Sequence, residues 1–360
     1  MLSAGDEYPI HQTPEPVAYS GSDRNFYDRY FFNGYSADGS TFFAAAMGVY
    51  PALNIIDGAV SILRNGKQSS VYLSRPLNRE RMDTHVGPLS VEVVEPLKKI
   101  RLRLEETEGL ALDVEFEGRA FPIEEPRFTR RIGSRMMMDL TRMTQNGRWT
   151  GSVRVDGESI DIRPEDFSGT RDRSWGVRPI GAPDPQPLIP APTPQFYWIW
   201  TPTNFPNLSM FYHVNHDEHG VPWNTRAVIV PDGVAQGEGI HLSDAQMNVT
   251  YAPGTRRMAS AYLDMTDPQG RAHKVTFEPI GTFLMKGIGY GHDKYRHGAF
   301  RGDQLAIARE DFEPSKMPWQ VPENLHIQEI VRATHEGPDG LGSEGIGTFE
   351  QLFMGPHAPS

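Results

Sequence analysis

Residues 100–116 read IRLRLEETEGLALDVEF, and this stretch decides the fold class. Apolar residues alternate with polar or small residues on both sides of the segment Glu105–Gly109. Successive side chains of a β-strand point to opposite faces, so this alternation predicts a hairpin with one buried face and one exposed face.

Turn sequences separate short apolar runs along the rest of the chain, as in all-β proteins. They lie at residues 64–67, 146–147, 156–157, 232–233 and 267–270. The runs between them predict strands at residues 26–32, 41–50, 60–63, 70–73, 89–94, 196–201, 209–214, 225–230, 274–278, 325–334 and 348–354. Helical patterns are scarce. The Met-rich segment 131–143 fits one short helix or a strand, and its methionines are either core filling or an adaptable ligand wall.

Seven prolines between Pro179 and Pro194 mark the clearest break in the chain. Such a segment favours a stiff, extended connector rather than a core element. We therefore predict an N-terminal extension at 1–22, a barrel at 23–178, a linker at 179–194 and a second barrel at 195–360. Each flank of the linker has the length of one lipocalin-type barrel.

The composition excludes several classes of function. Asp and Glu number 46 against 35 Lys and Arg, a formal net charge of −11, which disfavours nucleic acid and anionic membranes as partners. The chain has no cysteine, which excludes disulfides and thiolate metal sites. We see no signal peptide and no apolar run long enough to span a membrane, so we expect a cytoplasmic protein without stable membrane insertion.

Two glycine-bounded motifs stand late in each half, GTRDRSWG at 169–176 and GYGHDKYRHG at 289–298. Both run from Gly through charged residues to an aromatic residue and then Gly, which suggests a duplication. Together with the Pro-rich linker and the aromatic run QFYWIW at 195–200, they resemble the AttH-like proteins, which are related to carotenoid 1,2-hydratase (hydroxyneurosporene synthase). The resemblance extends from about Asp23 to Phe353.

This resemblance implies two consecutive lipocalin-like (calycin) antiparallel β-barrels that pack against each other, with ligand space at or near their interface. The characterised relatives, hydratases and some fungal decalin-forming cyclases, act on apolar substrates without a redox cofactor. We therefore expect no cofactor here, an apolar small molecule as substrate or ligand, and a homodimer as one option for assembly.

Asp172 and Trp175 are the first candidate catalytic residues. In an extended strand Asp172 and Ser174 face one side while Arg173 and Trp175 face the other, unless a bend at Gly176 brings acid and indole to one cavity. A buried carboxylic acid with a raised pKa can protonate an alkene, and an indole face can stabilise the resulting cation. The alternative is an Asp–Arg pair that fixes the barrel, with Trp175 as core filling.

Three residues of the second motif, His292, Tyr295 and His297, are the second set of catalytic candidates. If they face the same interface, one of them positions water or takes a proton. The alternative is polar packing at a barrel rim. The candidates for substrate binding are aromatic, imidazole and thioether side chains near the predicted interface: Tyr197, Trp198, Trp200, Tyr212, His213 and Met137.

Other patterns carry less chemistry. His213, His216 and His219 suggest a metal by spacing, but a strand would point the first two to opposite faces, so we predict no metal site. Gly340, Gly342 and Gly345 match a dinucleotide fingerprint without its strand–helix context, and we interpret them as a loop. The arginines within 127–135 fit a solvated face, or else a site for a substrate carboxylate or phosphate.

The sequence therefore favours a cofactor-independent lyase, hydratase, isomerase or cyclase that acts on an isoprenoid, steroid-like or aromatic substrate. Asp172 is the predicted acid. The first alternative is a carrier that binds a hydrophobic ligand without chemistry, which predicts a cavity wall with few titratable groups. The second is an interaction protein with collapsed barrels and no pocket.

Overall fold

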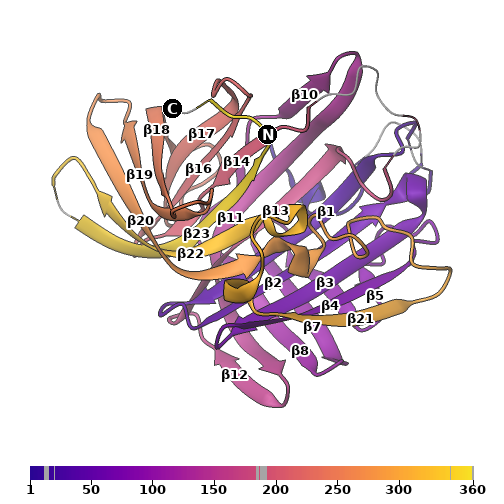
Figure 1. Ribbon diagram of the computed structural model, residues 1–360. Coiled ribbons are helices and arrows are strands. Elements are labelled where there is room, and N and C mark those ends of the chain that lie inside the picture. The colour runs from indigo at the N-terminus through magenta and orange to yellow at the C-terminus, as the bar shows by residue number, and fades with distance from the viewer. Residues whose placement is uncertain (12–15, 20, 184–185, 187–192, 341, 359–360) are drawn as a thin grey trace.

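The structure is a computed structural model that describes residues 1–11, 16–19, 21–183, 186, 193–340 and 342–358. The described chain is built from antiparallel β-strands in two sheets, joined by turns and five short 3-10 helices (Figure 1). These are η1 (Ala4–Glu7), η2 (Pro51–Leu53), η3 (Met285–Ile288), η4 (Pro314–Lys316) and η5 (Pro322–Asn324). The predicted all-β fold class is confirmed.

The first sheet has 14 strands and forms most of the N-terminal half. Its main path runs β21-β4-β3-β2-β1-β13-β11-β8-β7-β6-β5, and β9, β10 and β12 pair with β11. Its strands are β1 (Phe26–Ser36), β2 (Thr41–Tyr50), β3 (Ile55–Arg64), β4 (Lys67–Pro76), β5 (His85–Val86), β6 (Leu89–Glu95), β7 (Lys99–Thr107), β8 (Leu110–Gly118), β9 (Ile123–Glu124), β10 (Phe128–Ile132), β11 (Arg135–Val155), β12 (Glu158–Ile162), β13 (Phe167–Val177) and β21 (Ala306–Phe312). The sheet curls, so that β5 contacts β3 and β4 near the opposite end.

The second sheet forms a closed antiparallel barrel of eight strands, because β14 pairs with both β16 and β23. The short β15 adds a further pairing beside them. Its strands are β14 (Phe196–Trp200), β15 (Thr203–Asn204), β16 (Leu208–His216), β17 (Pro222–Pro231), β18 (Ile240–Tyr251), β19 (Met258–Thr266), β20 (Ala272–Leu284), β22 (Ile327–Glu336) and β23 (Gly342–Met354). Closure removes the unpaired edges that an open sheet would expose.

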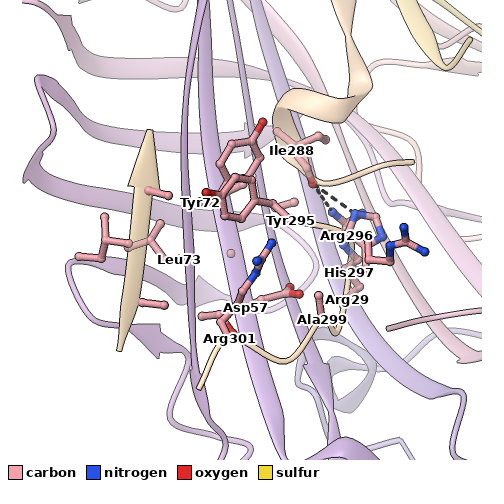
Figure 2. Close-up of a pocket in the computed structure, with 17 residues that line it drawn as sticks. Arg29, Asp57, Tyr72, Leu73, Ile288, Tyr295, Arg296, His297, Ala299 and Arg301 are labelled. Carbon is pink, nitrogen blue, oxygen red and sulfur yellow. Dashed lines mark hydrogen bonds between the residues drawn. The ribbon is translucent and has the colours of Figure 1, made fainter. Parts of the chain in front are cut away.

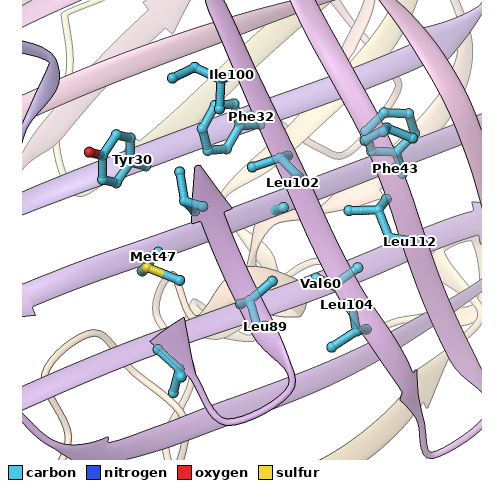
Figure 3. Packing of buried hydrophobic residues seen from close by; sticks show 14 of the residues in the cluster. Tyr30, Phe32, Phe43, Met47, Val60, Leu89, Ile100, Leu102, Leu104 and Leu112 are labelled. Atoms are coloured by element: carbon cyan, nitrogen blue, oxygen red, sulfur yellow. The ribbon is translucent and has the colours of Figure 1, made fainter. Parts of the chain in front are cut away.

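The hairpin predicted from residues 100–116 is β7 and β8, and its apolar face enters the core of the first sheet. Ile100, Leu102 and Leu104 point inward, while Arg101 and Asp113 form an ion pair on the exposed face. Figure 3 shows these side chains together with Phe32 of β1 inside the curled sheet. The alternation therefore determines which face of each strand is buried.

A separate apolar cluster joins the two halves. It contains Phe31 and Tyr27 from the outer face of β1, and Trp198 and Trp200 from the outer face of β14. The outer faces of the two sheets thus pack against each other, and we call this contact the seam. A second connection is β21, which follows the barrel strand β20 in the chain but pairs with β4 of the first sheet (Figure 1).

The structure decides two local expectations, the fold of residues 131–143 and the turn at residues 146–147. Residues 131–143 belong to β10, its turn and β11, so the strand interpretation of this segment is right. The turn predicted at Asn146-Gly147 is wrong, since both residues lie inside β11. Asn146 donates a hydrogen bond to the Thr203 carbonyl, and a Cβ on Gly147 would lie 2.2 Å from the Phe116 ring. Close packing, rather than a turn, therefore requires glycine there.

The two glycine-bounded motifs do not adopt equivalent structures. Residues 169–176 are part of β13, whereas 289–298 form a loop after η3. Half of the predicted linker 179–194, residues 184–185 and 187–192, lies outside the described residues, and the domain division remains a prediction. Among the described residues, no helix has the length and apolar character needed to cross a membrane.

Candidate functional site

A cavity of about 260 Å³ lies in the seam, and we call it the seam cavity. Its wall combines aromatic and thioether side chains with a few ionisable groups from both halves. The lining residues that bear on the chemistry below are Tyr27, Phe128, Met137, Met138, Leu140, Arg142, Asp172, Ser174, Arg178, Phe196, Trp198, Tyr290, His326, Glu350, Leu352 and Met354. A mostly apolar hollow with few convergent polar groups is typical of small-molecule sites.

Strand alternation places these side chains. On β14, Phe196 and Trp198 face the seam cavity, while Tyr197 and Ile199 point into the barrel core. On β23, Glu350 faces the cavity and Phe349 faces the barrel core. The cavity therefore lies between the outer faces of the two sheets and outside the barrel interior.

Asp172 enters the seam cavity from β13 and is 8% exposed. Its carboxyl makes no hydrogen bond to any of the described residues. Burial raises its pKa to about 7, with Arg142 acting in the opposite direction and Glu125 adding to the rise. An acid of this kind is protonated near neutral pH and is free to give its proton to a bound molecule.

Glu350 lies in the same lining as Asp172 but in a different electrostatic setting. Its Oε1 accepts hydrogen bonds from Trp198 Nε1 at 2.8 Å and His326 Nε2 at 2.9 Å. Its Oε2 accepts from Gln328 Nε2 at 2.6 Å. Burial alone would raise the pKa of Glu350, but His326 and these hydrogen bonds hold it below its ordinary value. Glu350 is therefore an ionised carboxylate that orients His326 and Trp198.

A further ion pair supports the wall beside Asp172. Arg142 Nη2 lies 2.5 Å from Glu125 Oε2, and the guanidinium stands 4.7 Å from the Trp198 ring. His213 lies behind Phe128, where its Nε2 bonds to Asn224 Oδ1 at 2.7 Å. Burial lowers the pKa of His213, which favours the neutral imidazole. His213 is thus close to the lining without being part of it.

A second hollow of about 620 Å³ adjoins the seam cavity, and we call it the vestibule. The two share Met137, Arg178, Pro179 and Tyr290 in their walls. The rest of the vestibule wall is formed by Arg24, Asn25, Ile132, Arg135, Met136, Ile180, Gly181, Ala182, Pro183, Gln186, Gly289, Gly291, Arg296 and His297. The vestibule extends the space available to a ligand beyond the seam cavity.

A third hollow of about 230 Å³ lies where the loop after η3 covers β2–β4 (Figure 2). Asp57 lines this hollow and is half-buried, and its partial burial raises its pKa to about 6 against the hydrogen bond from the Gly298 amide. Tyr295 stacks on Tyr72 at 4.4 Å, and His297 Nε2 donates to the Ile288 carbonyl at 3.2 Å. Tyr295 and His297 therefore line this hollow, and His297 also reaches the vestibule.

The structure separates Asp172 from Trp175. Asp172 and Ser174 face the seam cavity, while Arg173 and Trp175 occupy the other face of β13. Arg173 Nη1 lies 2.5 Å from Asp28 Oδ1, and Trp175 stacks on His11 with ring centroids 3.8 Å apart. The chain stays in β13 through Gly176, so no bend brings the indole to Asp172.

The remaining predicted residues divide between the seam and other places. Met137 and Trp198 line the seam cavity, and Trp200 is buried beside it, with Nε1 3.3 Å from Glu125 Oε1. Tyr197 and Tyr212 lie in the core of the second barrel. His292 is 3% exposed and bonds to Glu310 through Nε2 at 2.9 Å, apart from the seam cavity lining.

Within the described part of the chain, no group of three or more His, Asp or Glu residues is arranged to hold a metal ion. His216 bonds to His357, and His219 is exposed. The loop predicted around the three glycines lies partly in β23, which begins at Gly342, and residue 341 lies outside the described residues.

The sequence reasoning missed Glu350, His326, Arg142, Arg178 and Tyr290 as members of the seam cavity wall. One signal was available. Glu350 is the one charged residue in the run Thr348–Met354, whose other polar residues are Thr348 and Gln351. A charged residue in a buried strand needs partners, because an unpaired buried charge is costly. Arg178 and Tyr290 belong to loops whose approach to the seam no local pattern predicts.

The family model that matches the chain covers residues 2–360 and describes a family of unknown function (DUF8625). No curated protein matches the sequence. Kievitone hydratase from Nectria haematococca is 12% identical over 90% of this chain and 88% of its own, with a TM-score of 0.52. An AttH-like protein from Nitrosomonas europaea is 11% identical over 95% of this chain and 98% of its own, with a TM-score of 0.53. CghA, in a complex with Sch210972, is 9% identical over 98% of this chain and 96% of its own, with a TM-score of 0.54. These similarities confirm the AttH-like fold expected from the motifs.

Proposed function

The chain belongs to this family of unknown function, and we propose that it is a cofactor-independent enzyme that adds, removes or shifts a proton on an apolar small molecule in the seam cavity. The reaction classes are hydratase or lyase, and isomerase or cyclase. One observation carries the proposal. Asp172 is a buried acid with a raised pKa, free of hydrogen bonds to the described residues, in the same apolar wall as the ionised Glu350.

Asp172 has the properties of a general acid. Its proton would pass to a carbon of a C=C bond, whose electron pair forms the new C–H bond and leaves a cation on the neighbouring carbon. Trp198 lines the same cavity, and its indole would stabilise that cation. Glu350 holds the indole through Nε1, so the ring is oriented before a substrate arrives.

The cation has two outcomes, and both balance. In a hydratase, water adds to the cation and loses one proton to the Asp172 carboxylate, which is thereby restored. In an isomerase the cation loses a proton from a neighbouring carbon to the Asp172 carboxylate, and in a cyclase a second C=C bond first closes a ring onto the cation and the new cation then loses that proton. His326 lines the cavity and its Nε2 is bound to Glu350, while its Nδ1 makes no hydrogen bond to the described residues. It is our candidate to position the water or to relay the proton.

The ionisable wall favours an enzyme over a carrier, because a carrier needs only apolar contacts and has no use for a buried neutral acid. Relatives of similar fold support this choice, since one of them is named a hydratase. Fold similarity alone does not assign a reaction.

The test is isotope uptake. The purified protein is incubated with an extract of apolar metabolites in water labelled with heavy oxygen, and in a parallel sample in heavy water, followed by mass spectrometry. A hydratase transfers both labelled oxygen and deuterium to carbon, whereas an isomerase or cyclase transfers deuterium to carbon without labelled oxygen. Asp172→Asn should abolish both labels, whereas the exposed control Asp166→Asn should retain them. Compounds that are bound but never labelled would indicate a carrier.

A further inference from the structure

The wall of the vestibule is rich in arginine. The chain carries a formal net charge of −11, yet the vestibule lining contains four arginines and, among the described residues, neither Asp nor Glu. Among the described residues, Arg178 and Arg296 form no ion pair with a carboxylate; their guanidinium groups bond to His297 and to backbone carbonyls, and Arg178 also interacts with the Tyr290 hydroxyl. The vestibule therefore places the guanidinium groups of Arg178 and Arg296 beside an apolar cavity in an acidic protein.

Three other arginines with little exposure have carboxylate partners, whereas the buried Arg29 and Arg81 bond to hydroxyl or carbonyl oxygens. Arg142 pairs with Glu125, Arg171 with Glu7, and Arg173 with Asp28. This is the usual arrangement, because an unpaired buried charge is costly. Arg178, which is half-buried, belongs with the second group, since no carboxylate of the described residues forms an ion pair with it.

Arg178 stands where the seam cavity and the vestibule meet, since it lines both. Its guanidinium lies 4.3 Å from the centroid of Tyr27 and 5.5 Å from that of Tyr290. Its Nη2 lies 3.5 Å from Nδ1 of His297, which accepts the hydrogen bond because Nε2 donates to Ile288. Burial, with Arg29 and Arg178 nearby, holds the pKa of His297 well below its ordinary value, so the neutral imidazole supplies no counter-charge to Arg178.

Tyr290 lines both hollows beside Arg178. Its hydroxyl oxygen accepts a hydrogen bond of 2.7 Å from Arg29 Nη1, which leaves the hydroxyl proton available to donate. Arg29 is 2% exposed, and Figure 2 shows it beside His297, where both donate to the Ile288 carbonyl. Arg29 is thus fixed, and it polarises the Tyr290 hydroxyl toward donation.

We propose that Arg178 and Tyr290 form a subsite for an oxyanion, and that the substrate is an organic acid with an apolar body. The body would fill the seam cavity, and a carboxylate, or an ionised enol or phenol, would meet Arg178 at its mouth. This inference rests on the proposed function, because it assumes that the seam cavity holds the substrate. Guanidinium groups suit such anions because charge-assisted hydrogen bonds to oxyanions are short and strong.

Two fluorescent probes with one aromatic body test this subsite. They are 8-anilinonaphthalene-1-sulfonate, an anion, and N-phenyl-1-naphthylamine, its neutral counterpart. We expect the wild-type protein to bind the anion at least about tenfold more tightly. Arg178→Gln should remove that preference and leave the affinity for the neutral probe unchanged, and Arg178→Lys should restore part of it. The control Arg154→Gln, at an exposed residue paired with Glu106, should change neither affinity.

Ser174→Phe, which fills the seam cavity from β13, separates failure of this inference from failure of the proposed function. If Ser174→Phe blocks binding of the neutral probe but the wild type binds both probes equally, the oxyanion subsite is wrong, while the seam cavity remains the binding site. If neither probe binds, or if Ser174→Phe blocks neither, both proposals are wrong. Equal weakening of both probes by Arg178→Gln would overturn the subsite in favour of a packing role. If Arg178→Gln does not fold, Tyr290→Phe, which keeps the ring, provides a second test. Loss of the preference for the anionic probe in this variant supports the subsite, and an unchanged preference contradicts it.

Discussion

Asp172 on β13 and Glu350 on β23 line one cavity from opposite halves of the fold, and their pKa values are shifted in opposite directions. Burial raises the pKa of Asp172 to about 7. Glu350 is buried as well, but His326 and its hydrogen bonds hold its pKa below the ordinary value. Two carboxyls in such different environments can act as acid and as fixed charge near neutral pH.

Asp172→Asn should lower turnover of the true substrate by about 10²–10⁴-fold, the usual contribution of a general acid. In the wild type kcat/KM should fall as pH rises through about 7, where the acid loses its proton. Steady-state kinetics across pH check both effects. Full turnover in Asp172→Asn would remove this residue from the mechanism.

Asp172 should also make stability depend on pH, without any substrate. Between the ordinary pKa of 3.8 and the folded value of about 7, the folded state holds a proton that the unfolded chain has released. The contribution of this group to stability is therefore lost as pH rises through that window. Asp172→Asn stays neutral, so its free energy of unfolding should rise relative to wild type by a few kcal/mol, about 1.4 kcal/mol per pKa unit. Denaturant unfolding at pH values spanning the window measures the difference. A constant difference would mean that the folded pKa of Asp172 is ordinary.

Glu350→Gln should destabilise the seam. Glu350 accepts three hydrogen bonds, from Trp198, His326 and Gln328, and the amide of glutamine would turn a donor toward one of these donors. We expect a loss of about 1–3 kcal/mol in the free energy of unfolding. Tryptophan fluorescence should change as well, since Trp198 loses its partner. The exposed control Glu336→Gln should have neither effect, and unchanged stability in Glu350→Gln would contradict the assigned network.

Trp175→Leu should lower the stability of the protein without changing its activity. Trp175 stacks on His11 and lies away from the seam cavity, so the change should reduce stability by about 1–3 kcal/mol while turnover and probe binding remain as in wild type. Limited proteolysis should become faster in the N-terminal segment that carries His11. Loss of turnover at unchanged stability would show that the indole acts on the substrate after all.

Local alternation was sufficient to predict much of this fold. The period-two pattern in 100–116 identified β7 and β8, and Phe196–Trp200 divides between core and seam as its alternation predicts. Asp172 could be proposed because the motif around it is local. Asn146-Gly147 has the composition of a turn but lies inside β11, because glycine is needed there to admit the Phe116 ring.

The rest of the site depends on contacts between segments far apart in the chain. Glu350, His326 and Tyr290 meet Asp172 only after the barrel closes and packs on the first sheet. The pairing of β21 with β4 places Tyr295 and His297 over the first sheet and outside the seam cavity lining. No spacing within one motif encodes such contacts, which is why these histidine and tyrosine assignments could not be refined from the sequence.

The most direct test of the account is the protonation midpoint of Asp172, measured as the infrared difference between wild type and Asp172→Asn across pH, with and without N-phenyl-1-naphthylamine. We predict a midpoint near the value of about 7 without the probe. The midpoint should move higher with the probe, because an apolar ligand excludes water from the carboxyl. A midpoint in the ordinary carboxyl range near 4, or one that the bound probe leaves unmoved, would contradict the claim that Asp172 is a protonated acid facing the ligand.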